Sequence, residues 1–348
     1  MPSTLPSLTR REFTACAGAT VLTAVYAPNV FAQDKSGTKP IILGSGEHRY
    51  EAIHDWLKPP KTIAWGDTHG LCQDQQGRIY VAHTVHASSQ TKKAVLVFDA
   101  NGNYITAWGE EFQGGAHGLD IRDENGEEFL YHCDIRRRLV VKTTLNGNLV
   151  WQQSYPTQAE VYPSVDRYRP TNVAFAPNGD FFVGDGYGSS YIHRHSIEGE
   201  YISTLATPGS DKGQVSCPHG LWVDDRGDKP KLAVADRSNA RIQYFTLEGE
   251  HLGFVTEGMR KPCHFKTRGE LMLVPDLDSV ITLLDKDNKV VAHLGDGHPS
   301  SLRGAPRDKF IPGKFVHPHD AIFLNTGDIL VAEWVPIGRI TLLRKLDA

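Results

Sequence analysis

The sequence predicts an all-β chain folded as a single six-bladed β-propeller, and three observations lead to this prediction. Apolar, strand-like segments recur at separations of 45–55 residues between positions 69 and 319. Most repeats carry an Asn-Gly or similar pair between alternating apolar segments, which is a strong hairpin signal. Residues 33–348 contain no segment with a helical period longer than two turns.

Each repeat opens with a short apolar strand that begins at a polar residue. The six openings are His69-Gly-Leu, His117-Gly-Leu, Asn172-Val-Ala, His219-Gly-Leu, His264-Phe-Lys and His319-Asp-Ala. A second alternating strand follows in most repeats, over residues 79–82, 181–184, 232–235 and 329–332. Four short strands repeated six times are typical of propeller blades, and the spacing resembles that of NHL repeats. A pair of β-sandwiches is the alternative architecture.

The last repeat has only three strands before the chain reaches Leu346. The segment Tyr50–Trp56, which precedes the first blade, can supply the missing outer strand and close the ring. A closed ring leaves few free sheet edges, so we expect a monomer.

Residues 1–32 are predicted to be a twin-arginine signal peptide, and residues 33–348 a single propeller domain. Arg10 and Arg11 precede a weakly apolar run, and Val30-Phe31-Ala32 fits a cleavage site. We therefore expect a periplasmic or secreted protein; a disordered N-terminus with a chance Arg-Arg pair is the alternative. No later stretch approaches the length of a membrane span, so no membrane insertion is expected.

The composition argues against a nucleic-acid partner. The formal net charge is −4, and no basic patch is visible in the sequence. Four cysteines follow the leader, at positions 72, 133, 217 and 263, which is too few and too widely spaced for a disulfide scaffold. Cys217 and Cys263 lie near two of the histidines, so buried thiols, a disulfide and a thiolate ligand all remain open for them.

Five of the six blades begin their innermost strand with histidine. In a propeller this strand lines the central channel, so these side chains share one mouth. His117, His219 and His319 belong to blades two, four and six and project about 120° apart around the axis. Three neutral imidazoles arranged this way form a tripod for a divalent metal, with zinc as the default and one position open to a small-molecule substrate. Hydrogen-bonded packing histidines are the alternative.

Other residues are predicted to face the same mouth. His69, Asn172 and His264 form a second trio, as hydrogen-bond donors, substrate contacts or ligands for iron or copper. Tyr187 is a candidate general base and Arg237 a candidate carboxylate anchor, although both also fit structural roles. Glu333 also lies in the loops at this mouth, and the aspartates Asp185 and Asp236 are expected to cap turns.

These residues resemble the peptidyl-α-hydroxyglycine α-amidating lyases and their NHL-propeller relatives. The segments that carry the resemblance are 169–175, 184–190, 218–221, 235–243 and 318–320. The resemblance implies a six-bladed propeller with zinc on His117, His219 and His319, a catalytic tyrosine at Tyr187 and an active-site arginine at Arg237. It also implies a structural calcium held by Asp320 and a backbone carbonyl near Leu119. The family reaction splits a carbinolamide C–N bond into an amide and glyoxylate.

The chain departs from the family pattern at two positions. His69 stands in blade one without a counterpart of the family's other arginine, and His317 replaces the methionine two residues before the last histidine. No monooxygenase domain accompanies the propeller in this sequence. We therefore expect a metal-dependent lyase acting on a small hydroxylated, carboxylate-bearing compound. The alternatives are a metal-dependent hydrolase, dehydratase or epimerase on lactones or oxidised sugars, and a non-enzymatic binding propeller.

Overall fold

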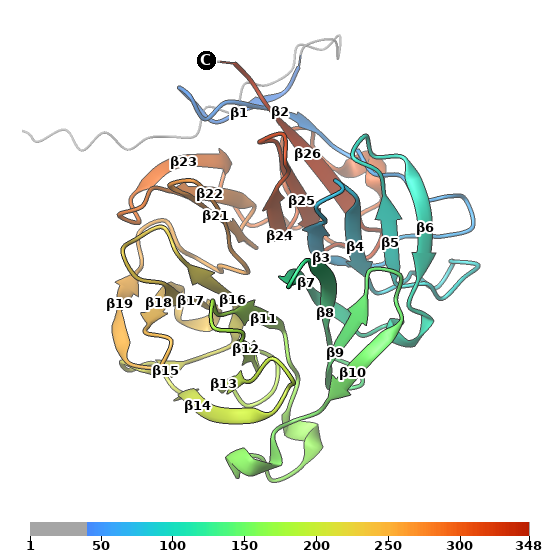
Figure 1. Cartoon of the computed structure of the whole chain (residues 1–348). Coiled ribbons are helices and arrows are strands. Elements are labelled where there is room, and N and C mark those ends of the chain that lie inside the picture. The colour runs from blue at the N-terminus through green and yellow to red at the C-terminus, as the bar shows by residue number, and fades with distance from the viewer. Residues whose placement is uncertain (1–39, 348) are drawn as a thin grey trace, which may run out of the picture.

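The computed structural model describes residues 40–347, which form six mainly antiparallel sheets arranged as blades around a central channel (Figure 1). The predicted six-bladed β-propeller is thus confirmed. The leader expected over residues 1–32 lies outside the described residues.

Each blade runs from an inner strand at the channel to an outer strand at the rim. Blade one contains β3 (Thr68–Gln73), β4 (Ile79–His83), β5 (Val95–Phe98) and β6 (Tyr104–Trp108). Blade two contains β7 (Ala116–Glu124), β8 (Glu127–Asp134), β9 (Leu139–Thr144) and β10 (Leu149–Gln153). Blade three contains β11 (Asn172–Phe175), β12 (Phe181–Gly184), β13 (Ile192–His195), β14 (Tyr201–Pro208) and the short parallel strand β15 (Gln214–Val215).

The remaining blades follow the same pattern. Blade four contains β16 (Pro218–Asp224), β17 (Lys231–Asp236), β18 (Arg241–Phe245) and β19 (His251–Val255). Blade five contains β20 (Lys266–Arg268), β21 (Leu271–Asp276), β22 (Val280–Leu284) and β23 (Val290–Gly295). Blade six contains β24 (Pro318–Phe323), β25 (Ile329–Glu333) and β26 (Arg339–Lys345), followed by β2 (Tyr50–Ile53) and β1 (Ile42–Leu43).

The helices between residues 40 and 347 are single 3₁₀ turns: η1 (Glu110–Phe112), η2 (Thr157–Ala159), η3 (Val165–Arg167), η4 (Arg237–Asn239) and η5 (Arg307–Lys309). In this part of the chain, no helix has the length and apolar character needed to cross a bilayer.

Blade six is completed by the beginning of the described chain. Strand β2 pairs antiparallel with β26, with Tyr50 opposite Lys345 and Ile53 opposite Leu342. The predicted closing segment therefore forms the fourth strand, although the strand ends at Ile53 rather than Trp56. Strand β1 adds a fifth by pairing with β2. Closure joins the two ends of the described chain within one sheet.

The core is divided into six apolar clusters, and each cluster fills the space between two neighbouring blades. Between blades six and one, for example, Leu71 and Phe98 pack with Ile322 and Leu342. This arrangement explains the apolar strands of the sequence, because the middle strands are covered by a neighbouring blade on both faces. The outermost strands are the exception and expose Ile105, Leu149, Ile202 and Leu252.

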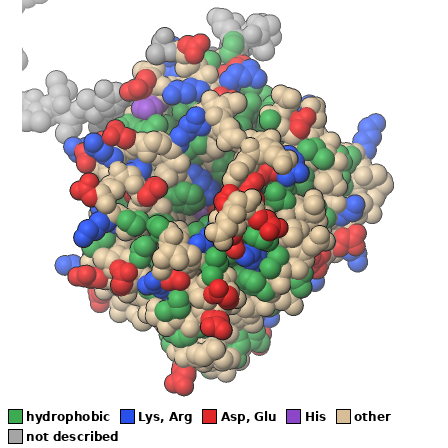
Figure 2. All heavy atoms as spheres, viewed as in Figure 1, with side chains coloured by type: hydrophobic (Ala, Val, Ile, Leu, Met, Phe, Trp, Pro, Cys, Tyr) green, Lys and Arg blue, Asp and Glu red, His purple; other side chains and the backbone are tan. Residues whose placement is uncertain are grey.

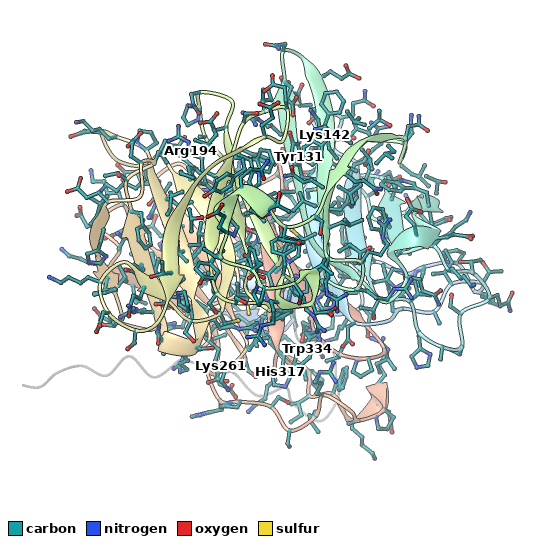
Figure 3. All side chains as sticks on the ribbon, turned by 90° about the horizontal axis from the view of Figure 1, so that it is seen from below. Tyr131, Lys142, Arg194, Lys261, His317 and Trp334 are labelled. Carbon is teal, nitrogen blue, oxygen red and sulfur yellow. The ribbon has the colours of Figure 1, made fainter. Side chains whose placement is uncertain are left out.

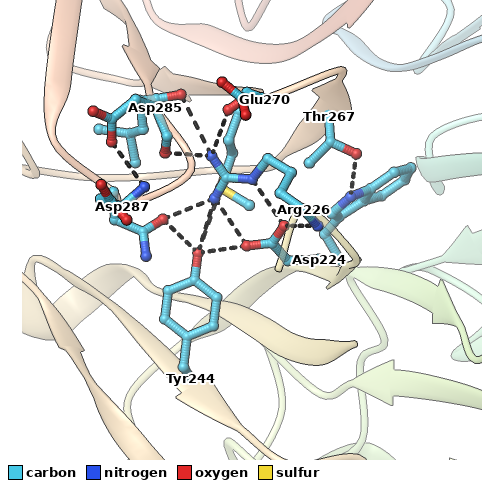
Figure 4. Close-up of polar contacts among 11 residues, drawn as sticks. Asp224, Arg226, Tyr244, Thr267, Glu270, Asp285 and Asp287 are labelled. Carbon is cyan, nitrogen blue, oxygen red and sulfur yellow. Dashed lines mark hydrogen bonds and ion pairs between the residues drawn. The ribbon is translucent and has the colours of Figure 1, made fainter. Parts of the chain in front are cut away.

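Polar contacts of the loops between strands also join neighbouring blades. Arg226, which follows β16, forms a buried ion pair with Asp224, its Nε lying 2.8 Å from Oδ1, and donates to the backbone carbonyl of Asp285 in blade five at 2.6 Å (Figure 4). Tyr244 donates to the same Asp224 at 3.1 Å. On the face seen in Figure 2, acidic and basic side chains are interspersed with apolar ones.

The closing strand generates the first prediction. Tyr50 is 1% exposed and packs in the cluster between blades five and six, so Tyr50→Ala removes a large buried side chain from the point of closure. We expect a loss of about 3–5 kcal/mol in the free energy of unfolding, measured by urea denaturation. The matched control is Tyr104→Ala on the outer strand of blade one, where the tyrosine is 37% exposed. Equal losses in the two variants would show that β2 does not close the ring.

Candidate metal centre and active site

Histidines gather at one end of the channel, where the inner strands of neighbouring blades approach one another very closely. Three of the histidines are followed by glycine, and a Cβ would not fit at these positions. A Cβ at Gly118 would lie 2.4 Å from the carbonyl oxygen of Thr171, and one at Gly220 would lie 2.2 Å from that of Cys263. The repeated His-Gly pair of the sequence therefore reflects close backbone packing around the axis.

The inner strands place His69, His117, Asn172, His219 and His319 at or near their first residues, as the repeat predicts. His264 differs, because β20 begins only at Lys266. The ladder reaches His264 through an isolated bridge between Pro262 and Asp276 and a hydrogen bond from the Cys263 amide to Pro275. His317 lies outside the ladder, and its Nδ1 lies 2.8 Å from the carbonyl of Leu277. Figure 3 shows His317 and Trp334 at one end of the molecule and Tyr131, Lys142 and Arg194 toward the other.

Four imidazole rings meet on the axis. The ring centroid of His117 lies 4.7 Å from that of His69, 4.9 Å from that of His219 and 4.8 Å from that of His319. The rings of the expected trio, His117, His219 and His319, lie close together, but the group of ligand atoms that could hold one metal ion contains His69 in place of His219. The group whose ligand atoms all lie within 4.8 Å of one another consists of His69, His117 and His319. All four rings are buried.

The hydrogen bonds of the rings leave several nitrogen lone pairs unused. Nδ1 of His117 donates to the carbonyl of Thr171 and Nδ1 of His219 to that of Cys263, both at 2.9 Å, so each Nε2 carries a lone pair. Both Nε2 atoms face the single hydroxyl of Tyr187, at 3.3 Å and 3.0 Å, and one phenol proton can satisfy only one of them. Nδ1 of His319 is buried without a hydrogen-bond partner.

This donor set fits a divalent transition metal. Nε2 of His319 lies 3.4 Å from Nδ1 of His69. Two nitrogens bound tetrahedrally to one zinc ion at ~2.0–2.1 Å lie about 3.3 Å apart. Burial lowers the pKa of His117 to about 3 and holds the pKa values of His69, His219 and His319 well below the usual value, so the rings are neutral at pH 7. Three buried histidines can thus hold a metal ion, in a cavity of about 10 Å³ that admits little more than one ion or water.

Tyr187 and Arg237 lie beside the histidines, where the sequence predicted them. Nη1 of Arg237 donates to the Tyr187 hydroxyl at 3.5 Å, and its guanidinium carbon lies 5.2 Å from the centre of the tyrosine ring. Burial raises the pKa of Tyr187 to about 12, and the charge of Arg237 opposes this increase. Within residues 40–347, no carboxylate forms an ion pair with Arg237, and its other polar neighbours are the sulfur atoms of Cys217 and Cys263, at 3.2 Å and 3.9 Å.

The cysteines and the acidic turn residues have structural roles. Cys72, Cys133, Cys217 and Cys263 form no disulfide; Cys263 is buried and Cys217 is partly buried. Asp236 accepts from the amide of Ser216 at 2.7 Å and pairs with Arg241 at 2.6 Å, and Glu333 accepts from the guanidinium of Arg339. These buried carboxylates hold the loops at the ends of the second strands, as expected for Asp236.

A second polar layer crosses the axis beneath the histidines, and we call its five side chains the axial network: Asp120, Asn172, His264, Lys266 and Asp320. Asp320 accepts from the amide of Leu71 at 2.8 Å and from Nδ1 of His264 at 2.6 Å. Asp120 accepts from the ammonium of Lys266 and from the side-chain amide of Asn172. Asn172 in turn accepts from the amide of Leu221 at 2.8 Å.

The calcium ion implied by the resemblance does not fit this layer. Both carboxylate oxygens of Asp320 accept N–H donors, and the ammonium of Lys266 lies among the oxygens of the network. Calcium needs six to eight free oxygen ligands at ~2.3–2.6 Å. Leu119 is buried in β7, opposite His132. The expectation of calcium at Asp320 and Leu119 is therefore not supported by the residues present.

Sequence reasoning missed two cations at the site. Lys266 is one, because nothing in the repeat marks it as facing the axis. Arg303 is the other and comes from the long connection between blades five and six. Its guanidinium carbon lies 3.7 Å from the Trp334 ring centre, its Nη2 lies 2.7 Å from Asp67, and its charge contributes to the low pKa of His69. The Arg-Trp contact is readable only from the fold, since 31 positions separate the two residues.

Comparison with known proteins is consistent with this geometry. No family model matches the chain. Peptidyl-α-hydroxyglycine α-amidating lyase 1 of Drosophila melanogaster is 29% identical over 258 residues, which are 68% of this chain and 46% of the relative. Human NHL repeat-containing protein 3 is 24% identical over 237 residues, 64% of this chain and 65% of the relative. The chain resembles the amidating lyases and the NHL repeat proteins.

The chain spans about half the length of that lyase, so the match concerns the propeller rather than the whole relative. Among solved structures, streptogramin B lyase has a TM-score of 0.56 at 10% identity, covering 85% of this chain and 98% of its own. At that identity the likeness shows the fold alone.

Neutral histidines generate the second prediction. Zinc binding to the metal-free protein at pH 6 should release less than half a proton, because rings with strongly lowered pKa values carry no proton to displace. Three ordinary histidines with pKa values near 6.5 would release about two protons at this pH. Calorimetry in buffers of different ionisation enthalpy measures the number. A release near two would show that the rings are protonated before metal binds.

Proposed function

We propose that this chain is a metal-dependent lyase of the amidating-lyase type, which cleaves a small hydroxylated, carboxylate-bearing substrate at the histidine end of the channel. One observation carries the proposal: the partly buried Arg237 guanidinium has no carboxylate partner among the described residues and lies beside Tyr187, whose hydroxyl faces two histidine nitrogens. An unpaired cation at the mouth of a channel is suited to binding an anionic ligand.

The residues divide the work of such a reaction. Arg237 would bind the substrate carboxylate and orient the adjacent hydroxylated carbon toward Tyr187. Tyr187 would take the hydroxyl proton, and the C–N bond then breaks as the carbonyl of glyoxylate forms and the amide nitrogen receives a proton. A divalent cation on the histidines, for which we propose zinc, supplies Lewis-acid polarisation of the substrate oxygen. Burial raises the pKa of Tyr187 to about 12 and the charge of Arg237 opposes this rise. A cation held by the histidines beside the hydroxyl would lower the pKa further and so favour the phenolate that a base requires.

A second enzyme class is favoured by one observation, the presence of His69 in the histidine cluster. A fourth imidazole makes the site more polar and fits a metal-dependent hydrolase, dehydratase or epimerase that acts on lactones or oxidised sugars. Purified protein incubated with an α-hydroxyglycine compound should release glyoxylate in proportion to enzyme and time. Absence of glyoxylate together with turnover of a lactone or sugar acid would replace the lyase by the second class.

We also propose that the protein is exported from the cytoplasm. The twin-arginine leader expected over residues 1–32 would deliver the folded, metal-loaded propeller to the periplasm or the exterior, where it would act as a monomer on a soluble small molecule.

Metal content provides the third prediction. The protein as purified should contain about one equivalent of a transition metal, and His219→Ala should lower this content ~10-fold if His219 is a ligand. The same measurement on His69→Ala decides whether His69 belongs to the ligand set. His251→Ala, on the outer strand of blade four, is the control and should retain the metal. Less than a tenth of an equivalent in the unmodified protein would favour a binding propeller without catalysis.

Tyr187→Phe provides the fourth prediction. Removing the hydroxyl should lower kcat by about 10²–10⁴-fold, the range expected for loss of a general base, while metal content stays unchanged. Tyr191→Phe is the control and should retain full activity, because Tyr191 lies on the same loop as Tyr187, between β12 and β13. A Tyr187→Phe variant with more than a tenth of the original kcat would assign proton removal to another group.

A further inference from the structure

The axial network is a cluster of buried polar side chains that has no role in the proposed reaction, and its cation is Lys266. Its ammonium reaches from blade five across the channel to Asp120 in blade two, and its side chain is 13% exposed. The ammonium also lies 4.4 Å from the centre of the Trp222 ring in blade four, a cation–π contact. A buried ammonium with these partners is held in one place.

The network connects all six blades. Leu71 of blade one and His264 of blade five both donate to Asp320 of blade six. Lys266 of blade five and Asn172 of blade three both donate to Asp120 of blade two, and Leu221 of blade four donates to Asn172. Nε2 of His264 lies 3.8 Å from Asp120, between the two carboxylates. Most of these contacts join neighbouring blades, as the apolar clusters do, but the contact of Lys266 with Asp120 crosses the channel between blades five and two, which no apolar cluster connects.

Two carboxylates on the axis of a closed ring require positive charge nearby. Burying a carboxylate without a counter-charge is far more costly than burying a polar group. A divalent cation would satisfy both carboxylates, but here N–H donors already occupy their oxygens, and the ammonium of Lys266 supplies the positive charge on Asp120.

We propose that Lys266 takes the place of a divalent cation at the centre of the propeller, so that this chain closes around a covalently attached counter-ion and needs no calcium. This inference concerns the axial network alone, and it stands or falls independently of the lyase proposal, since the histidine layer and Tyr187 take no part in it.

The decisive experiment compares thermal unfolding and calcium binding in the unmodified protein and in Lys266→Met, each with its native metal at the histidines. Calcium prefers oxygen ligands and does not compete for imidazole. In calcium-free buffer, Lys266→Met should unfold at a midpoint lower by roughly 5–10 °C, because Asp120 loses its buried partner. Millimolar calcium should restore part of this loss in the variant, and it should bind to the variant at about one equivalent in equilibrium dialysis.

Calcium should leave the midpoint of the unmodified protein unchanged within about 1 °C and should bind at less than a tenth of an equivalent. Lys261→Met is the matched control for loss of a paired lysine, because the side chain of Lys261 is 54% exposed where it pairs with Asp278. Lys266→Met combined with Asp120→Asn is the control for the rescue, since it removes the carboxylate that would bind calcium and should gain nothing from the ion. Magnesium at the same concentration controls for ionic strength.

Stoichiometric calcium binding to the unmodified protein, or a rise of several degrees in its midpoint, would overturn the proposal. The proposal would also be overturned if Lys266→Met unfolded at the same midpoint temperature as the Lys261→Met control. If Lys266→Met does not accumulate as folded protein, the calcium titration of the unmodified protein decides alone: no binding supports the proposal and binding refutes it.

Discussion

The hydrogen bonds that cross the channel beneath the histidines are the constraint on which the rest of this structure depends. A propeller blade packs only against its two neighbours, so apolar burial alone leaves the opposite sides of the ring unconnected. Here Asp120 and Asp320 collect donors from the other blades and fix the inner strands relative to one another. All four oxygens of these two carboxylates accept hydrogen bonds, whereas Nε2 of His264, 3.8 Å from Asp120, is buried without a hydrogen-bond partner.

Two polar layers lie one above the other on the axis, and they differ in what they leave unused. The axial network pairs its carboxylates with an ammonium, an imidazole and amides, so it offers little to a ligand. The histidine layer leaves lone pairs on His117 and His219 that a single phenol cannot satisfy, and an unpartnered nitrogen on His319. Ligand binding is therefore expected in the histidine layer, where imidazole nitrogens lack hydrogen-bond partners, and not in the axial network.

The two cations Lys266 and Arg237 also differ in whether they have a carboxylate partner. Lys266 has a carboxylate partner, whereas Arg237 lies between two thiols and a phenol. A cation without an internal partner keeps its interaction available for a substrate. Arg303, stacked on Trp334 and paired with Asp67, adds a second cation near His69.

The sequence alone determined the blade number, the phase of the inner strands and the closing segment, because strand periodicity and turn pairs are local signals that a closed ring repeats six times. That phase placed His117 and His219 at one mouth, and the turns that follow the second strands placed Tyr187 and Arg237 there. Only the tertiary structure decided that His69 joins the cluster, that His264 turns to Asp320 and that Lys266 pairs with Asp120. The position of a residue in its strand determines where its side chain leaves the backbone around the channel axis. Which partner it reaches depends on the neighbouring blades, whose side chains come from residues up to 250 positions away in the chain.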